Sequence, residues 1–164
     1  MAQMAEVRLL ATTTDATFGT CGDVFVAIWR KNTTMLALQQ LNELFDNFRT
    51  THRAGCWLVT IVEEKASLPG AAERDAVAAW MAGIADVVKC SALSFEGTGF
   101  RAAAVRSVLT GLNVVSRQPF PHQVFGNVTA AVKFLFEKSG EAQSSTRSAT
   151  VLVETIEKLR AMGT

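Results

Sequence analysis

A glycine pair followed by an arginine forms the clearest candidate binding site in this sequence. The residues are Gly97, Thr98, Gly99 and Arg101. They stand between an apolar run and an amphipathic, arginine-bearing segment, an order that predicts a strand, a tight turn and the start of a helix. Free amides at a helix start and the positive end of the helix dipole attract anions, and Arg101 adds a positive charge. The pattern therefore predicts weak binding of a small anion such as phosphate.

The same segment, from Gly97 to Ala102, has the form of the dinucleotide fingerprint G-x-G-x-x-A. A dinucleotide site also needs an acidic residue about 20 positions later to bind a ribose hydroxyl. The sequence has no Asp or Glu between Glu96 and Glu137. We therefore expect no dinucleotide and no other cofactor. A phosphate, a nucleotide or a lipid stays open as the class of a small ligand.

Nucleophilic and metal-binding side chains are few and far apart along the chain. The 3 cysteines and 2 histidines form neither a C-x-x-C nor an H-E-x-x-H motif. They are Cys21, Cys56, Cys90, His52 and His122. A reactive thiol needs a neighbouring histidine or a helix N-terminus to lower its pKa. We expect buried, reduced cysteines, no metal site and no catalytic residue.

Glu63 and Glu64 end a predicted strand, where paired carboxylates can serve acid-base chemistry or bind a cation. Lys65 follows them directly. We expect this segment to be a solvated loop.

The composition limits both the size of the fold and the class of function. The chain has 164 residues, of which 49% are hydrophobic and 19% are charged. This length is enough for one domain with a substantial core. The hydrophobic fraction is high enough that a partner could cover part of the surface. The net charge of +1 argues against a nucleic-acid binder. Because the apolar runs are too short to span a membrane and no secretion signal is visible, we expect a cytoplasmic protein.

Apolar periodicity predicts an α/β domain, a single mixed sheet of about five strands covered by helices. Two antiparallel strands open the chain, at Glu6 to Thr13 and within Thr17 to Trp29. Cys56 to Val62 is apolar throughout, as expected of a central strand buried on both faces. Further strands are predicted at 92–95 and 122–125, and helices at 33–51, 71–87, 100–116, 128–137 and 149–162.

This layout resembles the STAS family, in the bacterial branch grouped with anti-sigma-factor antagonists and lipid-transfer domains. The likeness rests on Val24 to Arg30 leading into a helix and on Glu96 to Ser107. It implies a STAS-like domain over residues 1–140, with a linker and an added C-terminal helix, residues 141–164, packed on it. In the antagonists a serine of an Asp-Ser-x-Gly motif after the central strand is phosphorylated. The matching loop, Glu63 to Gly70, lacks that motif, and Ser67 is its only hydroxyl and the only phosphoacceptor that the resemblance offers.

The resemblance and the lack of a catalytic pattern favour a non-catalytic interaction module in bacterial signalling, which binds a protein partner or a second copy of itself. The alternative is a small-ligand-binding domain, with its site at the Gly97 to Arg101 turn or in an apolar cavity. Candidate interface residues lie on the alanine-rich helix and the last helix, where an apolar face could meet a partner. They are Trp80, Met81, Leu152 and Ile156.

Overall fold

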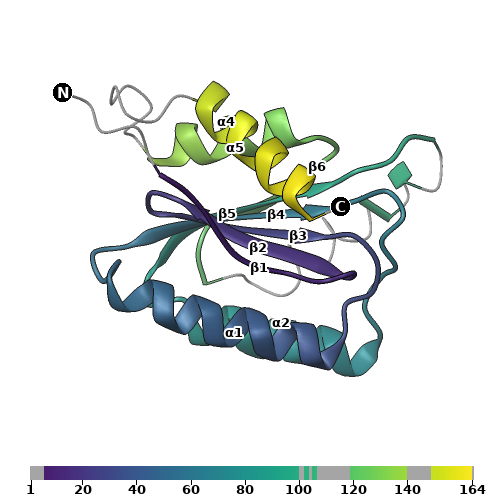
Figure 1. Cartoon of the computed structure of the whole chain (residues 1–164), viewed down its shortest axis with the longest axis horizontal. Helices are drawn as coiled ribbons and strands as arrows, with labels where there is room; N and C mark the ends of the chain where they lie inside the picture. Colours follow the sequence, from purple (N-terminus) through teal and green to yellow (C-terminus); the bar gives the residue numbers. More distant parts are fainter. Residues whose placement is uncertain (1–5, 100–101, 104, 107–118, 140–148, 164) are drawn as a thin grey trace.

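The chain folds into three layers, with one sheet between two pairs of helices (Figure 1). The computed structural model describes residues 6–99, 102–103, 105–106, 119–139 and 149–163. The strands are β1 (Val7–Thr12), β2 (Ala16–Cys21), β3 (Val24–Trp29), β4 (Cys56–Val62), β5 (Val88–Phe95) and β6 (His122–Phe125). The helices are α1 (Met35–Thr50), α2 (Ala71–Gly83), α4 (Val128–Ser139) and α5 (Ala149–Met162). The predicted mixed α/β architecture is confirmed.

The sheet has the strand order β1-β2-β3-β4-β5-β6. The first three strands form an antiparallel meander, and β3 to β6 run parallel. The described chain thus has six strands in its sheet. The extra strand arises because Thr17 to Trp29 is a hairpin and not one strand. Gly22, with φ +60°, and Asp23 make its turn, and Cys21 pairs with Val24 across it.

The central strand β4 is buried on both faces, as its sequence predicts. Leu58 packs on the face that α1 and α2 cover, in a core with Phe25 and Phe45. Val59 points to the opposite face and packs with residues of α4 and α5, among them Ile156. The sheet therefore separates two apolar cores, each closed by one pair of helices.

Two element boundaries differ from those that the sequence predicts, and one predicted helix is described only in part. α2 ends at Gly83, earlier than Val87, because Ile84 and Val87 turn into the core before β5 begins. β5 starts at Val88, before the predicted residue 92. The predicted helix at 100–116 lies mostly outside the described residues, and residues 102–103 and 105–106 within it are helical.

α5 lies across the N-terminal hairpin and packs on β1, β2 and α4. Gly19 on β2 allows the close approach. A Cβ at Gly19 would stand 2.7 Å from Cδ2 of Leu159 and 2.9 Å from the carbonyl oxygen of Arg8. The linker expected before α5, residues 141–148, lies outside the described residues, so the domain boundary stays a prediction. None of the helices in the described part of the chain is both long and apolar enough to cross a membrane.

Candidate functional site

Charged side chains follow three neighbouring parallel strands. Arg30 comes directly after β3, Glu63 after β4 and Glu96 after β5. The carboxyl ends of parallel strands meet at one edge of a sheet, and open α/β folds bind their ligands there. We call this the carboxyl edge. It is the first place at which a site is expected in this fold.

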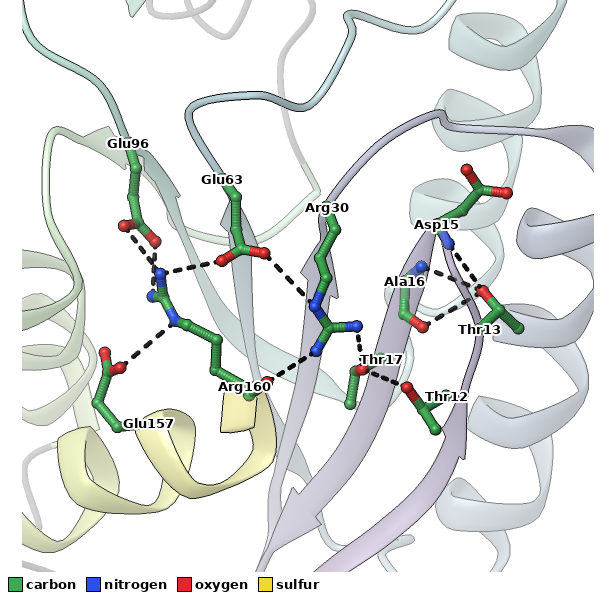
Figure 2. Close-up of polar contacts among 10 residues, drawn as sticks. All are labelled: Thr12, Thr13, Asp15, Ala16, Thr17, Arg30, Glu63, Glu96, Glu157 and Arg160. Carbon is green, nitrogen blue, oxygen red and sulfur yellow. Dashed lines mark hydrogen bonds and ion pairs between the residues drawn. The ribbon is translucent and has the colours of Figure 1, made fainter. Parts of the chain in front are cut away.

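Arg160, in the last turn of α5, joins the two glutamates at this edge (Figure 2). Its Nη1 lies 3.2 Å from Oε2 of Glu63, and its Nη2 lies 2.6 Å from Oε1 of Glu96. Its Nε lies 3.4 Å from Oε2 of Glu157, on the same helix. The end of α5 is thus bound to carboxylates that follow two different strands.

Arg30 makes the second set of contacts at the carboxyl edge. Its Nε lies 3.5 Å from Oε1 of Glu63, and its Nη2 donates to the backbone carbonyl of Arg160 at 3.1 Å. Its Nη1 donates to Oγ1 of Thr17, which in turn lies 2.9 Å from Oγ1 of Thr12. Figure 2 shows these contacts as one series from α5 to β1. We call it the polar row, and it consists of Thr12, Thr17, Arg30, Glu63, Glu96 and Arg160.

The polar row is shielded from water and its charges are paired internally. The side chain of Arg30 is 11% exposed, those of Glu63 and Arg160 are each 21% exposed, and that of Glu96 is 26% exposed. Burial alone lowers the pKa of Arg160, but the hydrogen bond to Glu96 and the charges of Glu96, Glu157 and Glu63 outweigh it and raise that pKa. Both arginines and both strand-end glutamates therefore have partners of opposite charge. This arrangement suits the joining of elements better than proton transfer.

The predicted anion site at the glycine turn has an acidic neighbour that the sequence did not suggest. Gly97 and Gly99 have φ values of +127° and +93°, which glycine adopts readily. A Cβ at Gly97 would stand 3.5 Å from Cγ of Glu64, so that carboxylate side chain lies beside the turn. Arg106 donates from Nη1 to the carbonyls of Phe95 and Gly97. Thr98 is exposed, and Arg101 lies outside the described residues, so anion binding here stays a prediction.

The cysteine thiols are placed where nucleophilic chemistry is disfavoured. Cys21, Cys56 and Cys90 are all buried and free. Burial raises the pKa of Cys56 to about 12, with a further contribution from Asp23, and burial raises the pKa of Cys90 to about 11. Both thiols are therefore protonated at neutral pH, and the thiolate is the nucleophilic form.

One serine and one histidine that are distant in sequence come together. Nδ1 of His122 lies 2.9 Å from Oγ of Ser91, across the β5–β6 pair. Burial lowers the pKa of His122 to about 4, and Ser91 is only 1% exposed. A base of so low a pKa is weak at neutral pH, and a serine this buried is closed to a substrate. His52, in contrast, stacks on Phe48 with ring centroids 4.0 Å apart.

Ser67 is exposed on the loop between β4 and α2 and forms hydrogen bonds with the segment after β3. Its amide donates to the carbonyl of Lys31 at 2.7 Å, and its hydroxyl donates to Oδ1 of Asn32 at 2.8 Å. The hydroxyl is accessible, and modification of Ser67 stays a prediction.

The four candidate interface residues are placed within the two cores. Met81, Leu152 and Ile156 are buried, at 8%, 3% and 0% exposure. Trp80 is half-buried and packs edge-on against Phe45, with ring centroids 5.5 Å apart. In this structure their apolar surface is covered by the chain itself.

Three of the large apolar side chains that are exposed in the described residues belong to segments near the loop of Ser67. Met35 is 52% exposed, Leu36 is 77% exposed and Leu68 is 51% exposed. Met35 and Leu36 begin α1 just after Asn32, and Leu68 follows Ser67, so the hydrogen bond from Ser67 to Asn32 brings their segments together. We call Met35, Leu36 and Leu68 the Leu36 surface. It lies on the α1 and α2 side, next to the carboxyl edge.

The interpretation of Glu63 and Glu64 as a solvated loop is wrong for Glu63, which is paired with two arginines. Sequence reasoning also missed Arg160, because its partners lie far away along the chain. For the residues at the strand ends a signal was present, because three of the predicted strands are each followed at once by a charged residue. Under the rule that parallel strands end at one edge, those residues had to be neighbours.

Comparisons with known proteins give a likeness of layout. Neither a protein-family model nor a curated protein matches this chain. A solved structure with a similar course is described as an uncharacterized protein from the DUF3478 family with a SpoIIAA-like fold, from Shewanella loihica PV-4. The sequence identity is 10%, the TM-score is 0.47, and the match covers 80% of this chain and 94% of that chain. The SpoIIAA-like fold is the STAS-like layout that the sequence resembles.

Proposed function

We propose that this chain is a non-catalytic interaction module that binds a protein partner through the Leu36 surface. The observation that carries the proposal is the exposure of Met35, Leu36 and Leu68 on two adjoining segments, with Leu36 at 77%. Large apolar side chains exposed together are costly in water and are typical of surfaces that a partner covers. The STAS-like layout supports a protein partner, since the antagonist branch works by binding other proteins.

The chemistry of the described residues favours binding over catalysis. The thiols of Cys56 and Cys90 have raised pKa values, and His122 has a lowered one. At the carboxyl edge, where an enzyme of this fold would expose its reactive groups, the charged side chains of the polar row bind one another. These features support a surface that recognises a partner by shape and apolar contact.

Affinity purification of the tagged full chain from its own cells tests the proposal. The wild type is compared with Leu36→Asp/Leu68→Asp, which places charges on the proposed surface. Leu9→Asp is the matched control, because Leu9 is also an exposed leucine, at 39%, but lies on the edge strand β1. Circular dichroism checks that all three chains fold.

We expect the same defined partner with the wild type and the Leu9→Asp control, and at least tenfold less of it with the double variant. A loss of about 1.4 kcal/mol in binding corresponds to that factor. Equal recovery from all three chains would contradict the proposal. Native mass spectrometry of the same samples shows whether a retained small molecule is present instead, which would favour a ligand-binding domain.

A further inference from the structure

Met35 is the member of the Leu36 surface that an oxidant can change. Its side chain is 52% exposed, and it stands beside Leu36, which is 77% exposed, at the start of α1. A thioether is oxidised readily by peroxides, whereas the aliphatic side chains of Leu36 and Leu68 are not. The Leu36 surface therefore carries its reactive atom in the sulfur of Met35.

The methionines of the described chain differ widely in burial. Met81 packs in the core on the α1 and α2 side and is 8% exposed, so little of it is open to an oxidant. Met162, at the end of α5, is 52% exposed, as Met35 is. It belongs to a helix on the opposite face of the sheet from the Leu36 surface (Figure 1). Met1 and Met4 lie outside the described residues.

The start of α1 does not depend on the sulfur of Met35. Thr34 caps the helix, because its side chain accepts from the amide of Ala37 at 3.1 Å. Ala37 and Leu38 are both buried and hold the first turn in the core. A change of polarity at the Met35 sulfur thus alters the surface and leaves the supports of the helix in place.

Oxidation converts the thioether into a sulfoxide. The sulfur attacks the OH oxygen of a hydroperoxide, so that an S–O bond forms and the O–O bond breaks. The sulfur gives up two electrons, and the proton of the attacked OH passes to the departing oxygen, which leaves as water or an alcohol. A sulfoxide oxygen accepts hydrogen bonds, so the side chain becomes polar, and covering it with an apolar partner surface costs free energy.

We propose that Met35 is an oxidation site, and that a hydroperoxide which converts its thioether to the sulfoxide releases the partner from the Leu36 surface. This inference rests on the proposed function, because it needs a partner on that surface. The contrast in exposure carries it: the sulfur-bearing side chain on the proposed binding surface is open, while that of Met81 is buried in the core. Oxidation thereby acts on binding and spares the fold.

Treatment of the purified full chain with hydrogen peroxide tests the site itself. Peptide mapping by mass spectrometry follows the gain of one oxygen atom at each methionine over time. We expect Met35 to be oxidised roughly tenfold faster than Met81, and the melting temperature of the oxidised chain to shift by about 2 °C or less. Oxidation of Met35 no faster than that of Met81, or loss of the folded state on oxidation of Met35, would overturn the proposal.

Partner binding is then compared in chains that differ at one methionine, with the peroxide removed before each chain meets the cell extract. The protein measured is the one that the wild type recovers and Leu36→Asp/Leu68→Asp does not. We expect peroxide to lower its recovery by the wild type roughly fivefold. Met35→Leu keeps an apolar side chain that peroxide does not attack, so its binding should resist the treatment. Met162→Leu is the matched control and should stay as sensitive as the wild type.

The results separate this proposal from the proposed function. If Leu36→Asp/Leu68→Asp recovers the same proteins as the wild type, the proposed function fails, and the release by oxidation fails with it. If that variant loses the partner but the peroxide-treated wild type keeps it, the proposed function stands and the oxidation site is overturned. Equal loss of binding by peroxide-treated Met35→Leu and wild type overturns the oxidation site as well.

Discussion

Arg30 and Arg160 are like charges that lie side by side, held together by the carboxylate of Glu63 between them. Oε1 of Glu63 lies 3.5 Å from Nε of Arg30, and Oε2 lies 3.2 Å from Nη1 of Arg160. Arg30 also donates to the carbonyl of Arg160 at 3.1 Å. Through these contacts the end of α5 is fixed to the ends of β3 and β4, which lie far from it in the sequence.

Replacing Glu63 should therefore destabilise the fold, because two arginines lose the carboxylate that they share. Glu63→Gln removes the charge that both arginines share, and we expect a loss of about 1 to 3 kcal/mol in the free energy of unfolding. Glu157→Gln is the control, because the side chain of Glu157 is 54% exposed and its ion pair with Arg160 lies at the surface. The control should change stability by about 0.5 kcal/mol or less. Urea denaturation measures both, and equal effects would contradict the shared role of Glu63.

Gly19 should not tolerate a side chain, because Leu159 of α5 occupies the space above it. Gly19→Ala should cost about 1 to 3 kcal/mol, since the backbone oxygen of Arg8, 2.9 Å from the new Cβ, cannot move freely. Gly83→Ala is the matched control: it is the last residue of α2, and a Cβ there meets nothing within 4 Å. That substitution should leave stability unchanged or raise it by about 0.5 kcal/mol. Thermal unfolding of both variants checks the difference in sign.

His122 should make the fold sensitive to mild acid. Its pKa is lowered from 6.5 to about 4 by burial, so the unfolded chain takes up this proton first. Stability from neutral His122 is present above pH 6.5 and is lost as the pH falls towards 4, by on the order of 3 kcal/mol. We expect His122→Asn to remove this part of the pH dependence. The free energy of unfolding of both chains is measured between pH 7 and 4. If it falls by the same amount in the two chains, a buried neutral His122 is ruled out.

The thiols should be unreactive until the chain unfolds. With pKa values of about 12 for Cys56 and about 11 for Cys90, both are protonated at pH 8. We expect a thiol reagent to label the native protein at least tenfold more slowly than the urea-unfolded chain, as for thiols without thiolate character. Fast labelling of one cysteine in the folded protein would identify a reactive thiol and reopen the case for an enzyme.

The elements that could be predicted from sequence are those whose signal is local. Cys56 to Val62 is apolar at every position, and this alone places β4 in the centre of the sheet. The sequence predicts one strand within Thr17 to Trp29 where the structure has the hairpin of β2 and β3, because the buried Ala16 to Cys21 segment has no apolar alternation to mark it. The contact between Arg160 and Glu63 depends on how α5 packs on the sheet. The contact between Ser91 and His122 depends on the order of the strands in the sheet. Neither is encoded in the spacing of residues along the chain.

The most direct test of the proposed interaction surface is photo-crosslinking in living cells. A photoreactive phenylalanine analogue is placed at position 36, whose native leucine is 77% exposed, and in a second chain at position 9, where the native leucine is 39% exposed. The account predicts one discrete adduct with another protein from position 36, and none of that adduct from position 9. No adduct from position 36, or the same adducts from both positions, would contradict a partner bound on the Leu36 surface.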